Sequence, residues 1–273
     1  MRYGVQLKSS DVSVELDGDH YGAPFWDKIS MRQYEPDTIG FLEDRCKDTT
    51  DFMDIGAANG AMTLIAASQG SRVSSYEPDP KIFRVVSQNV ELNPDLKSHI
   101  FLHNKAISAE SGIIRFKRDD NASILSAIVF TGYNDSDAVE IQVLSLAEEI
   151  GRFHSDKSRQ LLIKMDIEGA EWRILKSKPT LNALRENSAT LLLAVHPGFH
   201  RPFVPRLRGL DKIRLIRWKL QNRRESFQVF ELLTQFACIY RTNLNPVVNK
   251  HQFVDLIQAG YHEFILKFQA IYA

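Results

Sequence analysis

The sequence predicts an α/β fold of the Rossmann-like type, in which helices cover both faces of a mostly parallel sheet. Three observations lead to this prediction. From Asp51 onward, short apolar runs alternate with helical stretches, which is typical of βαβ units around a parallel sheet. The segments 161–165 and 191–195 are almost continuously apolar, as expected of strands covered on both faces. A tight turn of small residues at 56–60 joins an early strand to a helix.

The first 47 residues precede this alternation, and we expect them to form an N-terminal cap segment. Residues 4–17 alternate apolar and polar side chains, which is the period of a half-buried strand or hairpin. A helix is expected over 37–46. We therefore divide the chain into a cap at 1–47 and a Rossmann-like domain at 48–273, although a length of 273 residues also permits two small domains.

The first half of the alternating region contains the clearest boundary signals. We expect strands at 52–55, 73–76 and 100–102, with helices at 62–67 and 81–92 between them. Asp79 and Pro80 provide an N-cap and a first-turn proline for the second helix, which ends at Asn93 and Pro94.

The second half of the chain continues with further strands. We expect them at 113–116, 139–144, 161–165 and 191–195, with a helix from 146 to about 153. Ser145 and Glu148 have the spacing of a capping box at the start of that helix. The last two strands, at 236–240 and 262–268, are expected to form an antiparallel hairpin at the C-terminal edge of the sheet.

Composition and charge exclude several classes of protein. Hydrophobic residues make up 44% and charged residues 25%, which is the balance of an ordinary globular domain. Lys plus Arg and Asp plus Glu each number 34, so the overall charge gives no argument for a nucleic-acid partner, and none is expected. Cys46 and Cys238 are too few for a disulfide framework or a paired-ligand zinc site. Without a signal peptide or a bilayer-length apolar run, we expect a soluble, cytoplasmic protein of undetermined oligomeric state.

The sharpest chemical feature is the turn at 54–60, Asp54-Ile55-Gly56-Ala57-Ala58-Asn59-Gly60. Small residues let the backbone approach a ligand closely, and the free N–H groups of the following helix favour an anion such as a carboxylate. Asp54 could meet an ammonium group or orient the turn. A tight βα turn without a ligand is the alternative interpretation.

Glu77 ends the next strand about 20 residues after the turn, where a carboxylate can accept hydrogen bonds from both ribose hydroxyls of a nucleoside cofactor. A solvated helix-cap residue is the alternative for Glu77. The turn and Glu77 together fit both a nicotinamide dinucleotide and S-adenosylmethionine. A Gly-x-Gly-x-x-Gly pattern would require glycines in place of Ala58 and Ala61, and the last glycine is Gly60, so the turn favours S-adenosylmethionine.

A second polar group follows the strand at 161–165, in the run Lys164-Met165-Asp166-Ile167-Glu168-Gly169-Ala170-Glu171-Trp172. Open α/β sheets bind ligands at the carboxyl ends of their strands, so we expect Asp166 to face a cofactor or an acceptor. Glu168, two residues farther along, is a second candidate to face the cofactor or the acceptor. Alternatively, both acids begin a helix and complement its dipole.

Five ordered motifs together resemble the FkbM-type methyltransferase family. They are Tyr34-Glu35-Pro36, the turn at 54–60, Tyr76-Glu77-Pro78-Asp79-Pro80, Asn104-Lys105-Ala106-Ile107-Ser108 and the run at 164–171, and the similarity ends near His196. The resemblance implies a class I methyltransferase sheet of seven strands, S-adenosyl-L-methionine as cofactor, and O-methylation of a hydroxyl on a sugar, glycan or secondary metabolite. It also implies cofactor binding by Asp54, Gly56, Ala57, Ala58, Gly60, Glu77 and Pro78, with adenine contacts near Asn104 and Ala106.

The chain departs from the family pattern at two positions. Ala194 stands two residues before His196, where relatives often have glutamate, and Ala147 replaces a common acid in the capping-box region. The first departure argues against a carboxylate pair or metal ligands on that strand, so no obligatory metal is expected. His196 and Asp166 are then the catalytic candidates, as general base or as residues that position the acceptor. A structural role is the alternative for His196.

The segment 199–230 has a local excess of positive charge. Its nine lysines and arginines oppose only Asp211 and Glu225, and nine minus two gives +7 in a chain of net charge +0. We expect a basic insertion that binds an anionic or lipid-linked acceptor, or that rests on an anionic membrane surface and so makes the protein peripheral. A solvated helix is the alternative. The alternative functions are an NAD(P)-dependent oxidoreductase and a cofactor-binding interaction protein without catalysis.

Overall fold

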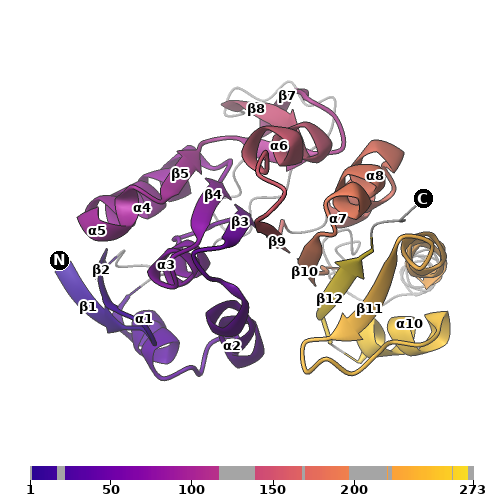
Figure 1. Ribbon diagram of the computed structural model, residues 1–273, viewed down its shortest axis with the longest axis horizontal. Helices are drawn as coiled ribbons and strands as arrows, with labels where there is room; N and C mark the ends of the chain where they lie inside the picture. The colour runs from indigo at the N-terminus through magenta and orange to yellow at the C-terminus, as the bar shows by residue number, and fades with distance from the viewer. Residues whose placement is uncertain are drawn as a thin grey trace, which may run out of the picture.

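The centre of the molecule is a seven-stranded sheet. The computed structural model describes residues 2–16, 22–116, 139–167, 170–196, 220, 223–259 and 261–269. In the order in which they lie side by side, the strands are β11 (Ala237–Arg241), β12 (Glu263–Phe268), β10 (Thr190–Ala194), β9 (Gln160–Met165), β3 (Thr50–Ile55), β4 (Arg72–Tyr76) and β5 (Ile100–His103) (Figure 1).

The pairing of these strands confirms the predicted fold class. The strands from β10 to β5 run parallel to one another, and β12 is antiparallel to both β10 and β11. The two C-terminal strands therefore form the predicted antiparallel edge, but they are not joined by a tight turn. Helix α10 (Lys250–Gln258) lies between them in the sequence, and β12 enters the sheet between β10 and β11.

Helices cover both faces of the sheet. Successive side chains of each strand point to opposite sides, so apolar residues on both faces need to be covered. Phe52 of β3 enters one apolar core and Met53 enters the other. The first core is shared by α1 (Ala23–Ser30), α2 (Pro36–Arg45), α3 (Ala61–Ser68) and α4 (Pro80–Glu91). The second is shared by α6 (Leu146–Phe153), α7 (Glu171–Leu175), α8 (Lys178–Glu186) and α10 (Figure 1). The short helix α5 (Pro94–Lys97) follows α4.

Two of the predicted strands belong to a separate small sheet. Strands β6 (Ala106–Ser108), β8 (Val139–Ser145) and β7 (Gly112–Phe116) pair in the order β6-β8-β7. Ala106, Ile141 and Val143 form a small core of their own beneath this sheet. The predicted strands at 113–116 and 139–144 are therefore correct as elements, but they lie outside the central sheet.

The N-terminal segment packs against the same core as α3. Strands β1 (Arg2–Gln6) and β2 (Asp11–Glu15) form an antiparallel hairpin, which is one of the two alternatives expected for this segment, and α2 is the predicted helix before β3. Helix α1 lacks a clear signal in the sequence, although it buries Trp26 and Ile29. These elements share a core with the central sheet, so the packing does not separate the first 47 residues from the rest of the chain. The division into a cap at 1–47 and a domain at 48–273 stays a prediction.

The helix caps agree with the sequence at one position and differ at another. Asp79 accepts hydrogen bonds from the backbone N–H groups of Lys81 and Ile82, as predicted for the N-cap of α4. The predicted capping box at Ser145 is wrong, because its side chain makes no cap hydrogen bond with α6. Instead, the Ser111 hydroxyl accepts from the Ser145 N–H at 2.9 Å and donates to the Glu148 carboxylate at 2.8 Å.

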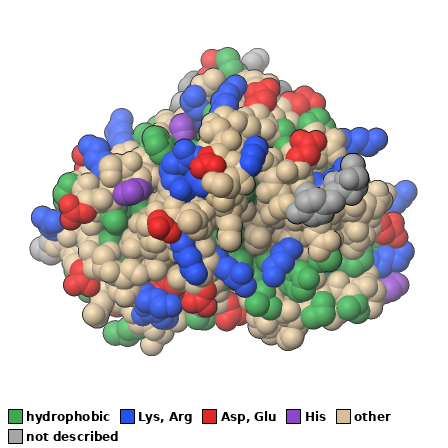
Figure 2. Space-filling model, in the orientation of Figure 1, with side chains coloured by type: hydrophobic (Ala, Val, Ile, Leu, Met, Phe, Trp, Pro, Cys, Tyr) green, Lys and Arg blue, Asp and Glu red, His purple; other side chains and the backbone are tan. Residues whose placement is uncertain are grey.

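Charge is mixed over the surface. Figure 2 shows acidic and basic side chains interspersed across one face of the molecule, in keeping with the net charge of +0. Among the described residues, no helix combines the length and the apolar character needed to cross a bilayer.

A close backbone approach at Gly56 holds the carboxyl ends of three strands together. The Gly56 N–H donates to the carbonyl of Tyr76 at 3.0 Å, and the Asp166 N–H donates to the carbonyl of Ile55 at 3.0 Å. Gly56 has a φ of +86°, and a Cβ atom on it would lie 1.9 Å from the Asp166 carbonyl oxygen. Only glycine satisfies both the left-handed backbone and the lack of space.

We predict that Gly56→Ala destabilises the protein by at least about 2 kcal/mol, because the left-handed backbone alone costs an L-residue ~1–2 kcal/mol and the clash adds to this cost. Urea denaturation measures the effect. Gly40→Ala is the matched control, since Gly40 lies in α2 and a Cβ atom on it would meet no heavy atom within 4 Å. It should stabilise the protein by about 0.5–1 kcal/mol. Equal denaturation midpoints for Gly56→Ala and the wild type would contradict the packing argument.

Candidate functional site

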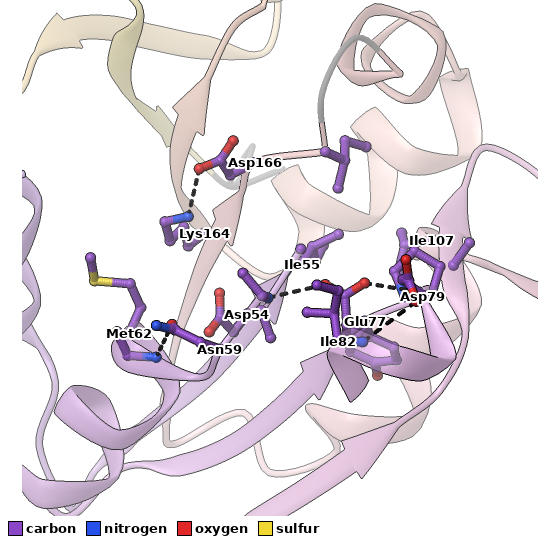
Figure 3. Close-up of a pocket in the computed structure, with 18 of the residues that line it drawn as sticks. Asp54, Ile55, Asn59, Met62, Glu77, Asp79, Ile82, Ile107, Lys164 and Asp166 are labelled. Carbon is purple, nitrogen blue, oxygen red and sulfur yellow. Dashed lines mark hydrogen bonds and ion pairs between the residues drawn. The ribbon is translucent and has the colours of Figure 1, made fainter. Parts of the chain in front are cut away.

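A cleft of about 270 Å³ opens at the carboxyl ends of β3, β4 and β9. It is lined by Phe25, Tyr34, Glu35, Asp54, Ile55, Gly56, Ala57, Ala58, Asn59, Ala61, Met62, Tyr76, Glu77, Pro78, Asp79, Ile82, Lys105, Ala106, Ile107, Lys164, Asp166 and Ile167. Figure 3 shows that Glu77, Asp79, Ile82 and Ile107 lie at one end, Met62, Lys164 and Asp166 lie at the other, and Asp54 lies between them. Most of the predicted site residues are therefore brought together.

The turn after β3 lines the cleft and has an unusual, left-handed backbone at three of its residues. Gly56 and Gly60 both have left-handed backbones, and Ala58 shares this conformation with a φ of 49°. A Cβ atom on Gly60 would lie 2.5 Å from the side chain of Val86, so this glycine permits close packing of α3 against α4. From the sequence we expect these glycines to let a ligand approach, whereas in the structure both are required by contacts within the protein.

Glu77 connects the end of β4 to this turn. Its Oε2 accepts a hydrogen bond from the Ala58 N–H at 3.0 Å, and its Oε1 accepts from the Asp79 N–H at 2.9 Å. Burial raises the pKa of Glu77 to about 8, despite these two hydrogen bonds, which lower it. In the ionised form each carboxylate oxygen has a second lone pair, so ionised Glu77 can accept two further hydrogen bonds from a ligand.

Asn104 supports this end of the cleft without being one of its lining residues. Its Nδ2 donates to the carbonyls of Glu77 and Pro78 at 2.9 and 3.0 Å, which fixes the loop after β4. Pro78 and Ala106 do line the cleft, together with the apolar side chains of Ile82 and Ile107. Their predicted contacts with adenine stay predictions.

Asp54 is fully buried at the centre of the cleft. Its Oδ2 accepts a hydrogen bond from the Thr63 hydroxyl at 2.7 Å, whereas its Oδ1 is buried and has no hydrogen-bond partner among the described residues. Burial raises the pKa of this carboxyl group, although the neighbouring Lys164 opposes the shift. A buried carboxylate oxygen that lacks a donor is costly, so the position fits a ligand that supplies one.

Asn59 is a functional candidate that the sequence places within the turn but does not distinguish from its neighbours. Its Oδ1 accepts a hydrogen bond from the Ala61 N–H at 3.1 Å, which orients the amide. Its Nδ2 is buried and has no acceptor among the described residues. Because Asn59 and Asp54 both line the cleft, an unpaired donor and an unpaired acceptor lie in the same cavity (Figure 3).

The two catalytic candidates lie in contact at the ends of β9 and β10. Lys164 Nζ lies 3.0 Å from Asp166 Oδ2, and His196 Nε2 lies 3.5 Å from Asp166 Oδ1. The other ring nitrogen of His196 lies 3.0 Å from Glu171 Oε1. The sequence placed Asp166 and His196 at neighbouring strand ends, but it did not identify the roles of Lys164 and Glu171.

Charge determines the protonation of this group. Burial alone would lower the pKa of Lys164, but the carboxylates of Asp166, Glu35 and Asp54 outweigh it and raise that pKa. Burial alone would raise the pKa of Asp166, but Lys164 and His196 outweigh it and lower that pKa. Lys164 is therefore cationic and Asp166 anionic at neutral pH.

Ala194 faces a carboxylate on the neighbouring strand. It pairs directly with Glu263 across the antiparallel β10–β12 ladder. Burial and the charge of Glu35 raise the pKa of Glu263 to about 6. Within the described residues, no group of three or more His, Cys, Asp or Glu side chains could hold a metal ion, and the expectation of no obligatory metal stays a prediction.

Several predicted features lie outside the described residues. They are Glu168, Gly169 and most of the basic insertion at 199–230, of which residue 220 and residues 223–230 are described. The described end of the insertion is helical, and the Arg223 guanidinium lies 5.3 Å from the centre of the Phe227 ring.

A family model described as the methyltransferase FkbM domain matches residues 54–210. The chain belongs to the FkbM methyltransferase family. The match covers more than half of the 273 residues and includes the turn, Glu77, Asp166 and His196. It confirms the resemblance inferred from the five motifs. No curated protein gives a significant match to the chain.

The solved structures that the chain matches include methyltransferase FkbM from Methylobacillus flagellatus KT, with 18% identity over 81% of this chain and 44% of that chain, and a TM-score of 0.43. An O-methyltransferase from Bacillus cereus, in complex with SAH, has 13% identity over 86% of this chain and 81% of that one, and a TM-score of 0.42. A SAM-dependent methyltransferase from Agrobacterium tumefaciens has 13% identity over 71% of this chain and 53% of that chain, and a TM-score of 0.37. The chain thus spans less than half the length of the first.

The raised pKa of Glu77 predicts a pH-dependent stability. A carboxyl group whose pKa is raised in the folded state takes up a proton on folding. Its contribution to the unfolding free energy is therefore fully present below pH 4.5 and is lost as the pH rises through about 8. Between these values, the unfolding free energy of the wild type should fall relative to that of Glu77→Gln, by up to about 1.4 kcal/mol per pH unit. Urea denaturation at several pH values measures this difference.

Glu91→Gln is the matched control for this experiment. Glu91 is exposed at the end of α4 and pairs with Lys97 at 2.7 Å. Its free-energy difference from the wild type should lack the steep fall expected for Glu77, because an exposed side chain does not carry the burial cost of a buried carboxylate. If Glu77→Gln and Glu91→Gln give parallel curves, the buried carboxyl group at position 77 does not titrate as described.

Proposed function

We propose that the chain is an S-adenosylmethionine-dependent methyltransferase whose cofactor lies in the cleft across the ends of β3 and β4. The observation that supports this most directly is the buried Oδ1 of Asp54, which lacks a hydrogen-bond donor among the described residues and lines the cleft between Glu77 and Asp166. Membership of the FkbM family supports the same activity.

The lining residues fit the parts of this cofactor in order. Glu77 has two lone pairs for the ribose hydroxyls, and Pro78 and Ala106 offer small apolar contacts for the adenine. Asp54 accepts from the ammonium group. The Asn59 amide and the first N–H groups of α3 donate to the carboxylate. Gly56, Ala57, Ala58 and Gly60 form the backbone of the turn beneath the amino-acid part.

The cofactor, when bound, supplies a methyl group on a sulfonium centre. The protein must then align an acceptor, exclude water and remove one proton. Asp166 has a lowered pKa and is therefore a weak proton acceptor. His196 is the better candidate for the general base, with Glu171 and Asp166 orienting its ring.

We further propose that the acceptor is a hydroxyl of a sugar, glycan or secondary metabolite. An anionic or lipid-linked acceptor would be complementary to the basic segment at 199–230, which could also touch an anionic membrane surface. A cytoplasmic location and the lack of a nucleic-acid partner are part of the same hypothesis. The family match argues against a nicotinamide oxidoreductase, and turnover distinguishes the enzyme from a non-catalytic binding protein.

We predict that S-adenosylhomocysteine binds the protein and raises its unfolding temperature, because a ligand that binds only the folded state shifts unfolding by mass action. Glu77→Ala should remove most of this shift, since it deletes the acceptors for the ribose. Thermal denaturation with and without ligand measures the effect. Glu91→Ala should keep the full shift, and NAD should give none. A Glu77→Ala protein that binds S-adenosylhomocysteine as tightly as the wild type would disprove the ribose assignment.

The roles of His196 and Asp166 predict a loss of turnover with little loss of cofactor affinity. With an acceptor found by screening glycans, His196→Ala should slow single turnover by about 10²-fold or more, as expected for a general base. Asp166→Asn should slow it less, because Asp166 orients the ring. His251→Ala, which removes an exposed imidazole from α10, is the control. Near wild-type turnover in both site variants would leave the base unassigned.

A further inference from the structure

Glu35 occupies a strained position at the start of α2. It is the N-cap residue of this helix and has φ 41° and ψ 57°, a left-handed backbone that is unfavourable for glutamate. Pro36 follows it as the first helical residue. Strained backbones of this kind persist where the surrounding structure holds them, often at ligand sites.

The side chain of Glu35 lines the same cleft as Asp54. Its Oε2 is buried and has no hydrogen-bond partner among the described residues. Burial and the adjacent Glu35 carboxylate raise the pKa of Tyr34, which also lines the cleft. Asp54 and Glu35 therefore line one cleft, and each has a buried carboxylate oxygen without a described donor, Oδ1 and Oε2 respectively.

The charges of this end of the cleft do not balance. Asp54, Glu35 and Asp166 provide three carboxylates, and Lys164 provides one ammonium group. Lys164 Nζ is committed to Asp166 Oδ2 at 3.0 Å. Both Glu35 and Asp54 line the cleft, and the charge of Glu35 contributes to the raised pKa of Asp54.

A ligand at this position must therefore bring a cation with several donors. An ammonium group has three N–H donors and can therefore serve two carboxylate oxygens at once. Asp54 itself is 0% exposed, so its carboxylate is shielded from bulk water. Asn59, on the same turn as Asp54, offers the donor that an adjacent carboxylate would require. An ammonium beside a carboxylate is the arrangement of an α-amino acid.

We propose that Glu35 is a second carboxylate for the cofactor, and that its Oε2 joins Asp54 Oδ1 in accepting hydrogen bonds from the α-ammonium group of S-adenosylmethionine. This inference rests on the proposed function. It assigns the Tyr34-Glu35-Pro36 motif to recognition of the amino-acid end of the cofactor, opposite the ribose site at Glu77. Helix α2 thereby closes the cleft from the N-terminal segment.

Isothermal titration calorimetry with two ligands tests this role. The first is S-adenosylhomocysteine, and the second is its analogue in which hydrogen replaces the α-amino group. Glu35→Gln should weaken binding of S-adenosylhomocysteine by about tenfold or more, since it removes one charge-assisted hydrogen bond. The variant and the wild type should bind the analogue with affinities within about twofold. Glu35→Asp keeps the charge and should give an intermediate affinity for S-adenosylhomocysteine.

Glu43→Gln is the matched control, because Glu43 lies on the same helix and pairs with Arg32 at 2.8 Å outside the cleft lining. It should bind both ligands as the wild type does. Wild-type affinity of Glu35→Gln for S-adenosylhomocysteine, or an equal loss for both ligands, would overturn the assignment. If Glu35→Gln does not fold, wild-type affinity of Glu35→Asp for S-adenosylhomocysteine would overturn it instead. Failure of the wild type to bind S-adenosylhomocysteine would instead refute the proposed function.

Discussion

The site depends on the close approach of backbone between the turn after β3 and the end of β9. Gly56 lies against the carbonyl of Asp166, and hydrogen bonds join its N–H to β4 and the carbonyl of Ile55 to the Asp166 N–H. This contact fixes the carboxyl ends of three strands relative to one another. Asp54, Glu77 and Asp166 then face one cleft although they lie far apart in the sequence.

Two buried aspartates of β3 differ in the number of hydrogen-bond donors around them, and this difference distinguishes a structural carboxylate from one that is suited to a ligand. Asp51 is fully buried near the amino end of the strand, where burial would raise its pKa. Hydrogen bonds from His154, Arg72 and Arg159 outweigh burial and lower that pKa to about 2. Asp54 is equally buried but has only the Thr63 hydroxyl as a described donor, and burial raises its pKa. The paired aspartate stabilises the fold, whereas the unpaired one is suited to a ligand.

The same contrast explains the arrangement across the cleft. At one end Glu77 is held by two backbone N–H groups, and small or apolar side chains line the cleft there together with Asp79 (Figure 3). The proposed nucleoside part of the cofactor would bind at this end. At the other end, carboxylates outnumber the single lysine, which suits a cationic group. The proposed cofactor, with an adenosine at one end and an ammonium group near the other, is consistent with this difference between the two ends.

The sequence by itself determined the seven strands of the central sheet and helices α2, α3, α4 and α6, because hydrophobic periodicity, the Asp79 cap and the turn at 54–60 are local signals. It did not predict the order of the strands in the sheet, or elements such as α1, β6, α7, α8 and α10. It also placed Asp54, Glu77 and Asp166 at strand ends, since a parallel sheet brings such ends to one edge. It could not find Glu35 and Asn59, whose importance comes from buried polar atoms that have no partner among the described residues. Nor could it show that Ser111 replaces the capping box or that Glu263 faces Ala194. These features depend on contacts between residues distant in the chain, and only the packed tertiary structure decides them.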